Sequence, residues 1–200
     1  MGTVLHMSSQ RHIVPEMDVV LLAARSCVLD VGLRRTTLAD VARRAGVSRM
    51  TVYRQYGDLD AIVSALLTAE LLGLAQQAEA DAADRPTVRE SLVEAGVLVV
   101  ERLAVHPLWC RVLDLDPELL LPLVVDRLGS SQRAIVERLG EQVQRGQAEG
   151  SVRAGDAALL ATCLLLAAQS FVFSARVIAA EHKAEQTGGE LRRLLDGYLR

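Results

Sequence analysis

The sequence predicts an all-α fold, and three of its features lead to that prediction. Half of the 200 residues are hydrophobic, so the chain can bury a sizeable core. Apolar residues recur at helical spacing in segments that glycine and proline residues separate. No segment has the alternating apolar and polar pattern of a half-buried strand. We therefore expect about nine helices, divided between a three-helix N-terminal unit and a larger helical body.

Three helices are expected in the N-terminal unit, residues 15–57, after a flexible tail over residues 1–14. Their expected bounds are Pro15 to Val31, Thr37 to Ala45 and Ser48 to Tyr56. A proline at the first position matches the backbone angle of a helix start. Gly32, Gly46 and Gly57 follow the three helices directly, and glycine is the residue that most often ends a helix.

The body, residues 58–200, is expected to contain the other six helices. Prolines suit the starts of three of them, and aspartates suit the N-caps of two, because a carboxylate accepts from the free amides there. These residues are Pro86, Pro107, Pro117, Asp58 and Asp156. The expected helices cover residues 59–83, 86–106, 107–115, 117–149, 157–183 and 190–200. A break at Gly129 would divide the fourth, and turns are expected over 150–155 and 187–189.

Charge is distributed unevenly along the chain. The net charge is −3, yet residues 1–57 contain eight arginines and only four acidic residues. The remaining residues contain 14 basic and 21 acidic side chains. Neutralising phosphates requires cations gathered in one region, so this asymmetry points to nucleic-acid contact by the N-terminal unit.

Residues 36–56 have the pattern of a helix-turn-helix. Ala42 is small where the two helices must cross closely. Gly46 lets the chain turn sharply between them. Val47 and Val52 are apolar on the face turned toward the other helix, and Ser48 can cap the second. This combination at fixed offsets predicts DNA binding rather than a chance pair of helices.

The second helix of this motif has a face that is free for contacts with bases. At 100° per residue, Val52 and Tyr56 point inward. The residues that then point outward are Met50, Thr51, Tyr53 and Arg54, with Arg49 on the flank near the N-terminus. Arginine can hold guanine through two hydrogen bonds, and threonine or methionine methyl groups can touch thymine. Tyrosine and glutamine suit phosphates or base edges. The segment is therefore expected to enter the major groove.

On these residues the sequence resembles the TetR family of transcriptional regulators. The matching positions are Gly32, Thr37, Val41, Ala42, Ala45, Gly46, Val47, Ser48, Thr51, Val52, Tyr53 and Tyr56, within residues 16–65. The resemblance implies a repressor that binds double-stranded operator DNA as a homodimer and is released by a small-molecule effector. It implies base contacts by Arg49, Met50 and Tyr53, and phosphate contacts by Thr37, Thr51, Arg54 and Gln55. With the cap Ser48, these form the expected DNA-binding set.

Two positions depart from the family pattern. Met50 stands where a glycine is common, which places a bulky apolar side chain toward the groove. Leu59 stands where a lysine often contacts a phosphate. The arginines expected to compensate for that lysine are Arg34, Arg35, Arg43 or Arg44.

The resemblance also implies an effector cavity and a dimer interface in the body. The expected pocket residues, polar or polarisable groups among apolar neighbours, are His106, Trp109, Cys110, Thr162, Cys163, Gln169, Ser170 and Phe173. The expected interface residues on the last two helices are Ala161, Leu164, Ala168, Phe171, Leu191, Leu195 and Tyr198. With only six aromatic residues in the chain, a slim apolar effector is favoured over a large planar one.

Other functional classes have weaker support. His106, Cys110 and Asp114 repeat every fourth residue, but one helix rarely supplies a complete metal site with its supporting groups. We expect no metal, no cofactor, no catalytic residues and no enzymatic activity. The alternatives left open are a helical metal- or redox-sensing protein and a protein-interaction module that does not bind DNA.

The cysteines and the apolar segments indicate where the protein acts. Cys27, Cys110 and Cys163 are scattered and odd in number, which suits a reducing compartment. Residues 157–175 approach the length of a membrane span, but a helix buried on two sides of a soluble assembly explains them better. We therefore expect a cytoplasmic protein with no membrane partner.

Overall fold

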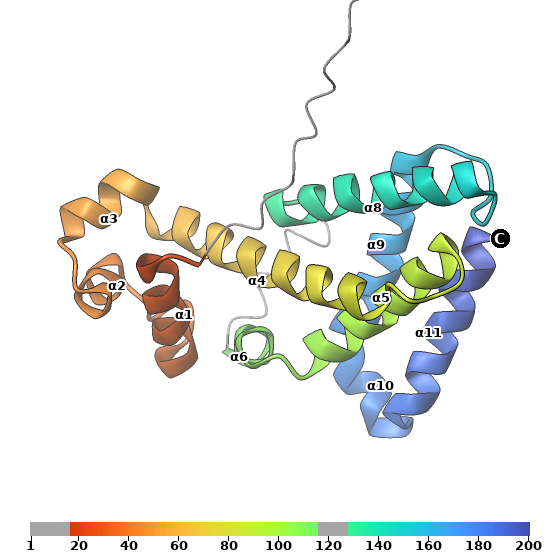
Figure 1. Ribbon diagram of the computed structural model, residues 1–200. Coiled ribbons are helices and arrows are strands. Elements are labelled where there is room, and N and C mark those ends of the chain that lie inside the picture. Colours follow the sequence, from red (N-terminus) through yellow and green to blue (C-terminus); the bar gives the residue numbers. More distant parts are fainter. Residues whose placement is uncertain (1–16, 116–127) are drawn as a thin grey trace, which may run out of the picture.

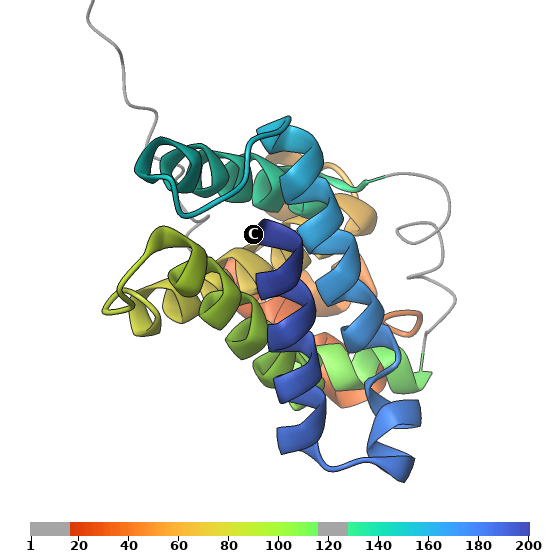
Figure 2. The ribbon, with the colours of Figure 1, turned by 90° about the vertical axis from the view of Figure 1, so that its right-hand side faces the viewer.

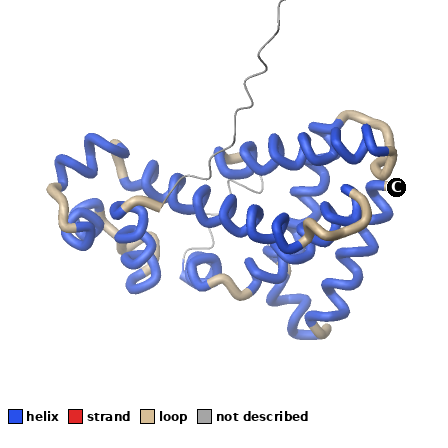
Figure 3. Tube along the Cα trace, in the orientation of Figure 1, coloured by secondary structure: helices blue, strands red, loops and turns tan. Residues whose placement is uncertain are grey.

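The computed structural model describes residues 17–115 and 128–200, which form ten helices and no strand (Figure 3). The all-α prediction is confirmed. The expected tail over residues 1–14 and the helix start at Pro117 lie outside the described residues.

The helices follow one another along an elongated molecule (Figure 1). Their bounds are α1 Val19–Val31, α2 Leu38–Ala45, α3 Arg49–Tyr56, α4 Leu59–Asp81, α5 Val88–Ala104, α6 Pro107–Leu115, α8 Ser130–Glu149, α9 Ala157–Phe173, α10 Ala175–Glu181 and α11 Ala184–Leu199. Helices α1 to α3 form one end, and α4 leads from them into the body. Figures 1 and 2 show α9 and α11 adjacent at the opposite end.

The start of α1 differs from the expected one. Asp18 is the N-cap, and its Oδ1 accepts hydrogen bonds from the amides of Val20 at 2.9 Å and Leu21 at 2.8 Å. The helix therefore begins at Val19, and the prediction of a start at Pro15 is wrong. A carboxylate that accepts hydrogen bonds from two free backbone amides determines where a helix starts more strongly than a preceding proline does.

The last two expected helices also differ from the observed ones. The chain bends by 58° between α9 and α10, at Ser174, so the expected helix over 157–183 is two helices. The expected turn over 187–189 lies inside α11 instead. Gly188 lies within α11 and does not end a helix. A Cβ there would meet Oε1 of the exposed Glu101 side chain at 2.7 Å, a contact that this flexible side chain can relieve by moving.

Helix α5 is the centre of the body. It contacts α4, α6, α8, α9 and α11, and six of its residues are buried. A helix covered on most sides carries apolar residues around its circumference, as this one does. The body is therefore a layer of helices wrapped around α5, and α4 and α6 connect it to α1.

The described residues include one helix, α4, that is long and apolar enough to cross a membrane by length and composition. Helices α9 and α10 would pass the same test only as one bent pair. Helix α4 packs against α1, α5 and α8. Within its most apolar stretch 22% is buried, and Leu67, Leu71 and Ala75 of α4 line a cavity in the body. This packing accounts for its composition without a bilayer.

Candidate functional site

The α2–α3 pair has the tight crossing that the sequence predicts. Val41 and Val52 are fully buried between the helices, and Ala42 is 3% exposed. Gly46 has φ +69° and ψ 25°, the left-handed conformation that a side chain disfavours. The turn is closed by Val47 N, which donates to the carbonyl of Ala42 at 3.1 Å. The helix-turn-helix is therefore held by its own core.

Side-chain caps define the N-terminal ends of both helices. Thr37 Oγ1 accepts from the amide of Asp40 and donates to its carboxylate at 2.5 Å. This hydrogen bond, with help from Arg43, lowers the pKa of Asp40. Ser48 Oγ accepts from the amide of Thr51 at 3.0 Å and lies 2.8 Å from its hydroxyl. Three of the expected DNA contacts thus sit at helix N-termini, which favour anions.

The outer face of α3 is open to solvent. Met50 is 68% exposed and Tyr53 is 60% exposed, which is unusual for large side chains on a well-packed helix. Arg49 and Arg54 are exposed beside them, and neither forms an ion pair with a described residue. Nothing in the described part of the chain covers this face.

Asp18 fastens α3 to the start of α1. Its Oδ2 accepts from Gln55 Nε2 at 2.5 Å and from the Tyr56 hydroxyl at 2.7 Å. Burial and this carboxylate raise the pKa of Tyr56. From the sequence, no contact was predicted for Asp18, and Gln55 was expected only as a phosphate contact. An aspartate directly before an apolar run is a cap signal, but its second role depends on tertiary contact.

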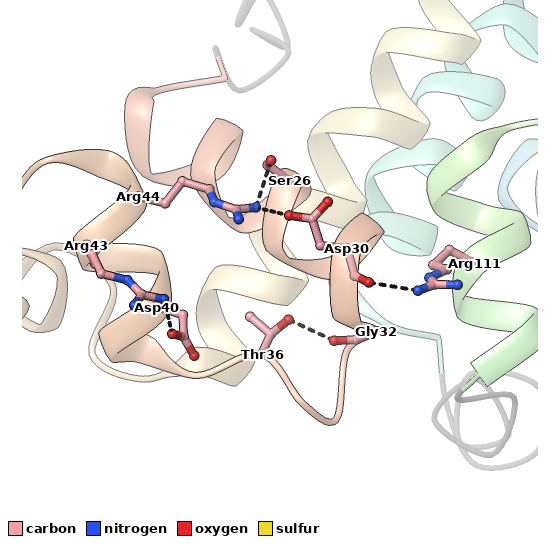
Figure 4. A network of polar contacts seen from close by, with 8 residues as sticks. All are labelled: Ser26, Asp30, Gly32, Thr36, Asp40, Arg43, Arg44 and Arg111. Atoms are coloured by element: carbon pink, nitrogen blue, oxygen red, sulfur yellow. Dashed lines mark hydrogen bonds and ion pairs between the residues drawn. The ribbon is translucent and has the colours of Figure 1, made fainter.

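Two of the arginines expected to compensate for Leu59 already have acidic partners (Figure 4). Arg43 pairs with Asp40 at 2.6 Å, and Arg44 pairs with Asp30 at 2.6 Å. Both pairs are exposed, so phosphates could compete for these arginines at little cost.

The body contacts α1 through two sets of polar groups, one in the middle of the helix and one in its last turn. Arg111 of α6 donates from Nη2 to the carbonyl of Asp30 at 2.9 Å (Figure 4). Arg25 of α1 donates from Nε to Glu70 Oε1 at 2.6 Å, and His106 Nε2 lies 3.1 Å from Oε2 of the same carboxylate. The hydrogen bonds from His106 and Arg25 lower the pKa of Glu70 despite its burial. Helices α4 and α6 therefore hold α1 at defined points.

The body contains a partly open cavity of about 530 Å³. Its walls come from α4, α5, α6, α8 and α9, with Leu195 from α11, and most wall residues are leucine, valine or alanine. Three of the expected pocket residues line it: Trp109, Gln169 and Phe173. The Trp109 and Phe173 ring centroids are 5.9 Å apart. This volume lies in the usual range for small-molecule sites.

The other five expected pocket residues do not line the cavity. His106 pairs with Glu70, and Cys110 Sγ donates to the carbonyl of Ala104 at 3.4 Å. Asp114, which the metal interpretation would need, pairs with Arg176. No group of three metal-ligating side chains occurs among residues 17–115 and 128–200. The remaining three are Thr162, Cys163 and Ser170.

Helix α9 presents one face to the cavity and another to solvent. Leu159 is 59% exposed and Leu166 is 45% exposed, and Thr162, Cys163 and Ser170 lie on that side at helical spacing. The opposite side is buried or lines the cavity. The expected pocket residues of this helix, except Gln169 and Phe173, therefore belong to its outer face.

Most of the expected interface residues are turned inward within the single chain. The four that are buried within the single chain are Ala161, Leu164, Leu191 and Leu195. The three that are half-buried are Ala168, Phe171 and Tyr198. On α11 the exposed apolar residue is Leu194, at 48%. Both helices were expected to bury their leucines against a partner subunit. In the single chain, most of these leucines already pack against α5 or line the cavity.

Comparison with known proteins agrees with the geometry of the N-terminal unit. A family model described as "Bacterial regulatory proteins, tetR family" matches residues 20–66. An uncharacterised HTH-type transcriptional regulator of Mycobacterium bovis is 41% identical over 180 residues, which cover 90% of this chain and 92% of the relative. A regulator with the same description from Mycobacterium tuberculosis has the same identity and coverage.

Solved structures have the same fold. The TetR family repressor AlkX from Dietzia, implicated in biodegradation of n-alkanes, gives a TM-score of 0.69 at 19% identity, covering 90% of this chain and 93% of that one. FadR from Bacillus subtilis, in complex with stearoyl-CoA, gives 0.61 at 16% identity, covering 91% and 98%. A helix-turn-helix with an open recognition face and relatives at 41% identity lead to one conclusion: the chain belongs to the TetR family of DNA-binding transcriptional regulators.

Proposed function

We propose that this regulator is a dimeric repressor, acting in the cytoplasm, which leaves its operator when a small apolar molecule occupies the cavity. The observation that carries this proposal is the position of α6. Trp109 on this helix lines the cavity, and Arg111, two residues later, donates to the last turn of α1. One short helix therefore touches both the effector site and the DNA-binding unit.

Base reading is assigned to the exposed face of α3. Arg49, Met50 and Tyr53 would contact base edges, because they lie near the end of the helix that enters the major groove. Arg54 would hold a phosphate together with Thr37 and Thr51. The absence of an ion pair at Arg49 and Arg54 with any described residue supports these roles, since neither must give up a partner to bind DNA.

Dimerisation is assigned to the outer faces of α9 and α11. Leu159 and Leu166 are seven residues apart and hence on one side of α9, and Leu194 is exposed on the adjacent α11. Exposed leucines gathered on neighbouring helices typically mark a contact surface. A two-fold interface there would bring two α3 helices to half-sites one helical turn apart, roughly 34–36 Å.

Release by the effector follows from the contacts of α6. A ligand shifts DNA affinity only through its different affinity for the two conformations of the protein. A molecule that displaces Trp109 from Phe173 would move α6, and with it the Arg111 contact to Asp30. The apolar wall supports an effector with a long apolar part, as does the similarity to FadR from Bacillus subtilis, solved in complex with stearoyl-CoA, whose acyl chain is long and apolar.

The test begins by selecting bound duplexes from a random pool with the full chain. We expect a two-fold symmetric operator whose binding weakens steeply with salt. Apolar metabolites are then screened for release of that operator. An Arg111→Gln variant should keep operator and ligand affinity within about threefold but lose most of the release. The control is Arg176→Gln, which removes the other arginine contact to α6. Equal release by both variants would contradict the role of α6.

A further inference from the structure

We propose that the effector is an uncharged apolar molecule with a carbonyl or ether oxygen, and that this oxygen accepts hydrogen bonds from Trp109 and Gln169 at the α6 end of the cavity. The inference rests on the proposed effector-responsive function and specifies the chemical class of its ligand. It comes from two hydrogen-bond donors on the cavity wall that have no acceptor among the described residues.

The first donor is the indole N–H of Trp109. Trp109 is 8% exposed and lines the cavity, yet its Nε1 has no hydrogen-bond partner. Native proteins rarely leave a buried N–H unpaired, and such a group calls for an explanation. This nitrogen has almost no accessible surface in the structure, so a ligand oxygen would become its acceptor by displacing Trp109 from Phe173.

The second donor is the side-chain NH₂ of Gln169, and it is identified from a chain of two hydrogen bonds between amide groups. The backbone N of Gly129 donates to Gln132 Oε1 at 2.8 Å, which fixes the orientation of that amide, because a backbone N–H cannot accept. Gln132 Nε2 then donates to Gln169 Oε1 at 2.6 Å. Because Oε1 of Gln169 accepts this hydrogen bond, its Nε2 is the atom that can still donate. No acceptor for Nε2 occurs among the described residues. Gln169 also lines the cavity, so its NH₂ is a second donor available to a ligand.

The charges on the wall argue for an uncharged ligand. The two cations among the described lining residues are Arg138 and Arg145. Arg138 is held by Glu79 through two hydrogen bonds of 2.6 Å, and Arg145 is exposed. A carboxylate beside Trp109 would be buried without a cation of its own, which is unfavourable. Two neutral donors suit a ketone, ester, lactone or ether oxygen, and the leucine and valine wall suits an apolar remainder.

The experiment compares three probes of similar size, namely undecane, methyl nonyl ketone and decanoate. Binding to the full chain is measured by calorimetry. Trp109 is the single tryptophan of the chain, so its fluorescence independently reports contact with the ligand. We expect the ketone to bind about tenfold more tightly than undecane, and more tightly than decanoate, because only the ketone offers an uncharged acceptor.

Three variants locate the oxygen. Trp109→Phe keeps an aromatic ring against Phe173 and removes the N–H, and Gln169→Met removes the amide at similar size. Each should reduce the preference for ketone over undecane, with both probes measured on the same variant, by about threefold to tenfold. The matched control is Gln76→Met, which removes a cavity-lining amide from α4 and should leave the preference intact.

The inference is wrong if the ketone and undecane bind equally, if no probe binds, if decanoate binds best, or if neither Trp109→Phe nor Gln169→Met reduces the preference. Its failure is separate from failure of the proposed function, which is measured by release of operator DNA. Equal binding of both probes with release of DNA would overturn only the ligand class. A variant-sensitive ketone preference without release would support the ligand class and overturn the effector role.

Discussion

Helices α3 and α9 both carry apolar side chains on two faces, but they differ in how those faces are used. In α3 the inner face is the single buried residue Val52, and the exposed Met50 and Tyr53 stand on the other side. In α9 leucines lie all around the helix, and only tertiary packing decides which of them face the cavity and which face solvent. A short motif with fixed partners can therefore be interpreted from local sequence, whereas a uniformly apolar helix cannot.

The largest effect is expected from a charge in the core of the helix-turn-helix. Val52→Asp places a carboxylate where no partner exists, which should destabilise the N-terminal unit by about 3 kcal/mol or more and abolish DNA binding. Thermal unfolding followed by circular dichroism measures the loss. Met50→Asp, on the exposed face, should leave the unfolding temperature nearly unchanged. Equal destabilisation by both would remove the distinction between the two faces of α3.

The next effect tests the two faces of α9. Leu159→Glu combined with Leu166→Glu should weaken dimerisation at least 100-fold, about 2.7 kcal/mol, because apolar contact area is lost and like charges meet. Light scattering coupled to size-exclusion chromatography measures the oligomeric state. Val177→Glu, an exposed apolar position on α10, is the control and should leave the dimer intact. A dimer that survives the double change would place the interface elsewhere.

Arg49 and Arg54 sharpen the comparison within α3 itself. Arg49→Ala should cost about 1–3 kcal/mol at one base pair and relax sequence preference there. Arg54→Ala should weaken binding to all sequences and reduce the salt slope by about 1, because one phosphate contact is lost. Operator titrations at several salt concentrations, on the selected site and on a scrambled one, separate the two roles. Identical profiles for both variants would contradict this division.

The smallest effect is expected at Asp18. Asp18→Asn keeps a capping oxygen for α1 but removes the charge that Gln55 and Tyr56 bind. We expect a loss of about 1 kcal/mol in operator affinity, with α1 still helical. Gel-shift titration and circular dichroism give the two readouts. If the Asp18→Asn variant binds the operator as tightly as the parent chain does, the hydrogen bonds from α3 to this carboxylate do not contribute to DNA binding.

The local features of the N-terminal unit could be predicted from sequence because each depends on neighbours within a few residues. Ser48 caps the helix that it precedes, and Gly46 turns the chain where the pattern requires it. The double role of Asp18 escaped prediction, because Gln55 and Tyr56 reach it across 37 and 38 residues.

The body shows the opposite case. Thr162, Cys163 and Ser170 were expected to face a ligand because they are polar, but the cavity is mainly apolar and they lie on the outer side of α9. Leu164 and Leu195 were expected to face a partner because they are large and apolar, but they line the cavity. A hollow core and a subunit contact require the same residue types, so composition alone could not assign the faces.

Asp30 has a consequence for how insensitivity to an effector could arise. Its carboxylate accepts a hydrogen bond from Arg44 of α2, and its backbone carbonyl accepts one from Arg111 of α6, so this single residue contacts both helices. In the proposed mechanism, a shift of α6 would therefore reach Asp30, a residue that does not line the cavity. A genetic screen for variants that still bind DNA but no longer respond to the effector should therefore yield substitutions in the last turn of α1. From the sequence alone, these positions would be taken for surface residues without a function.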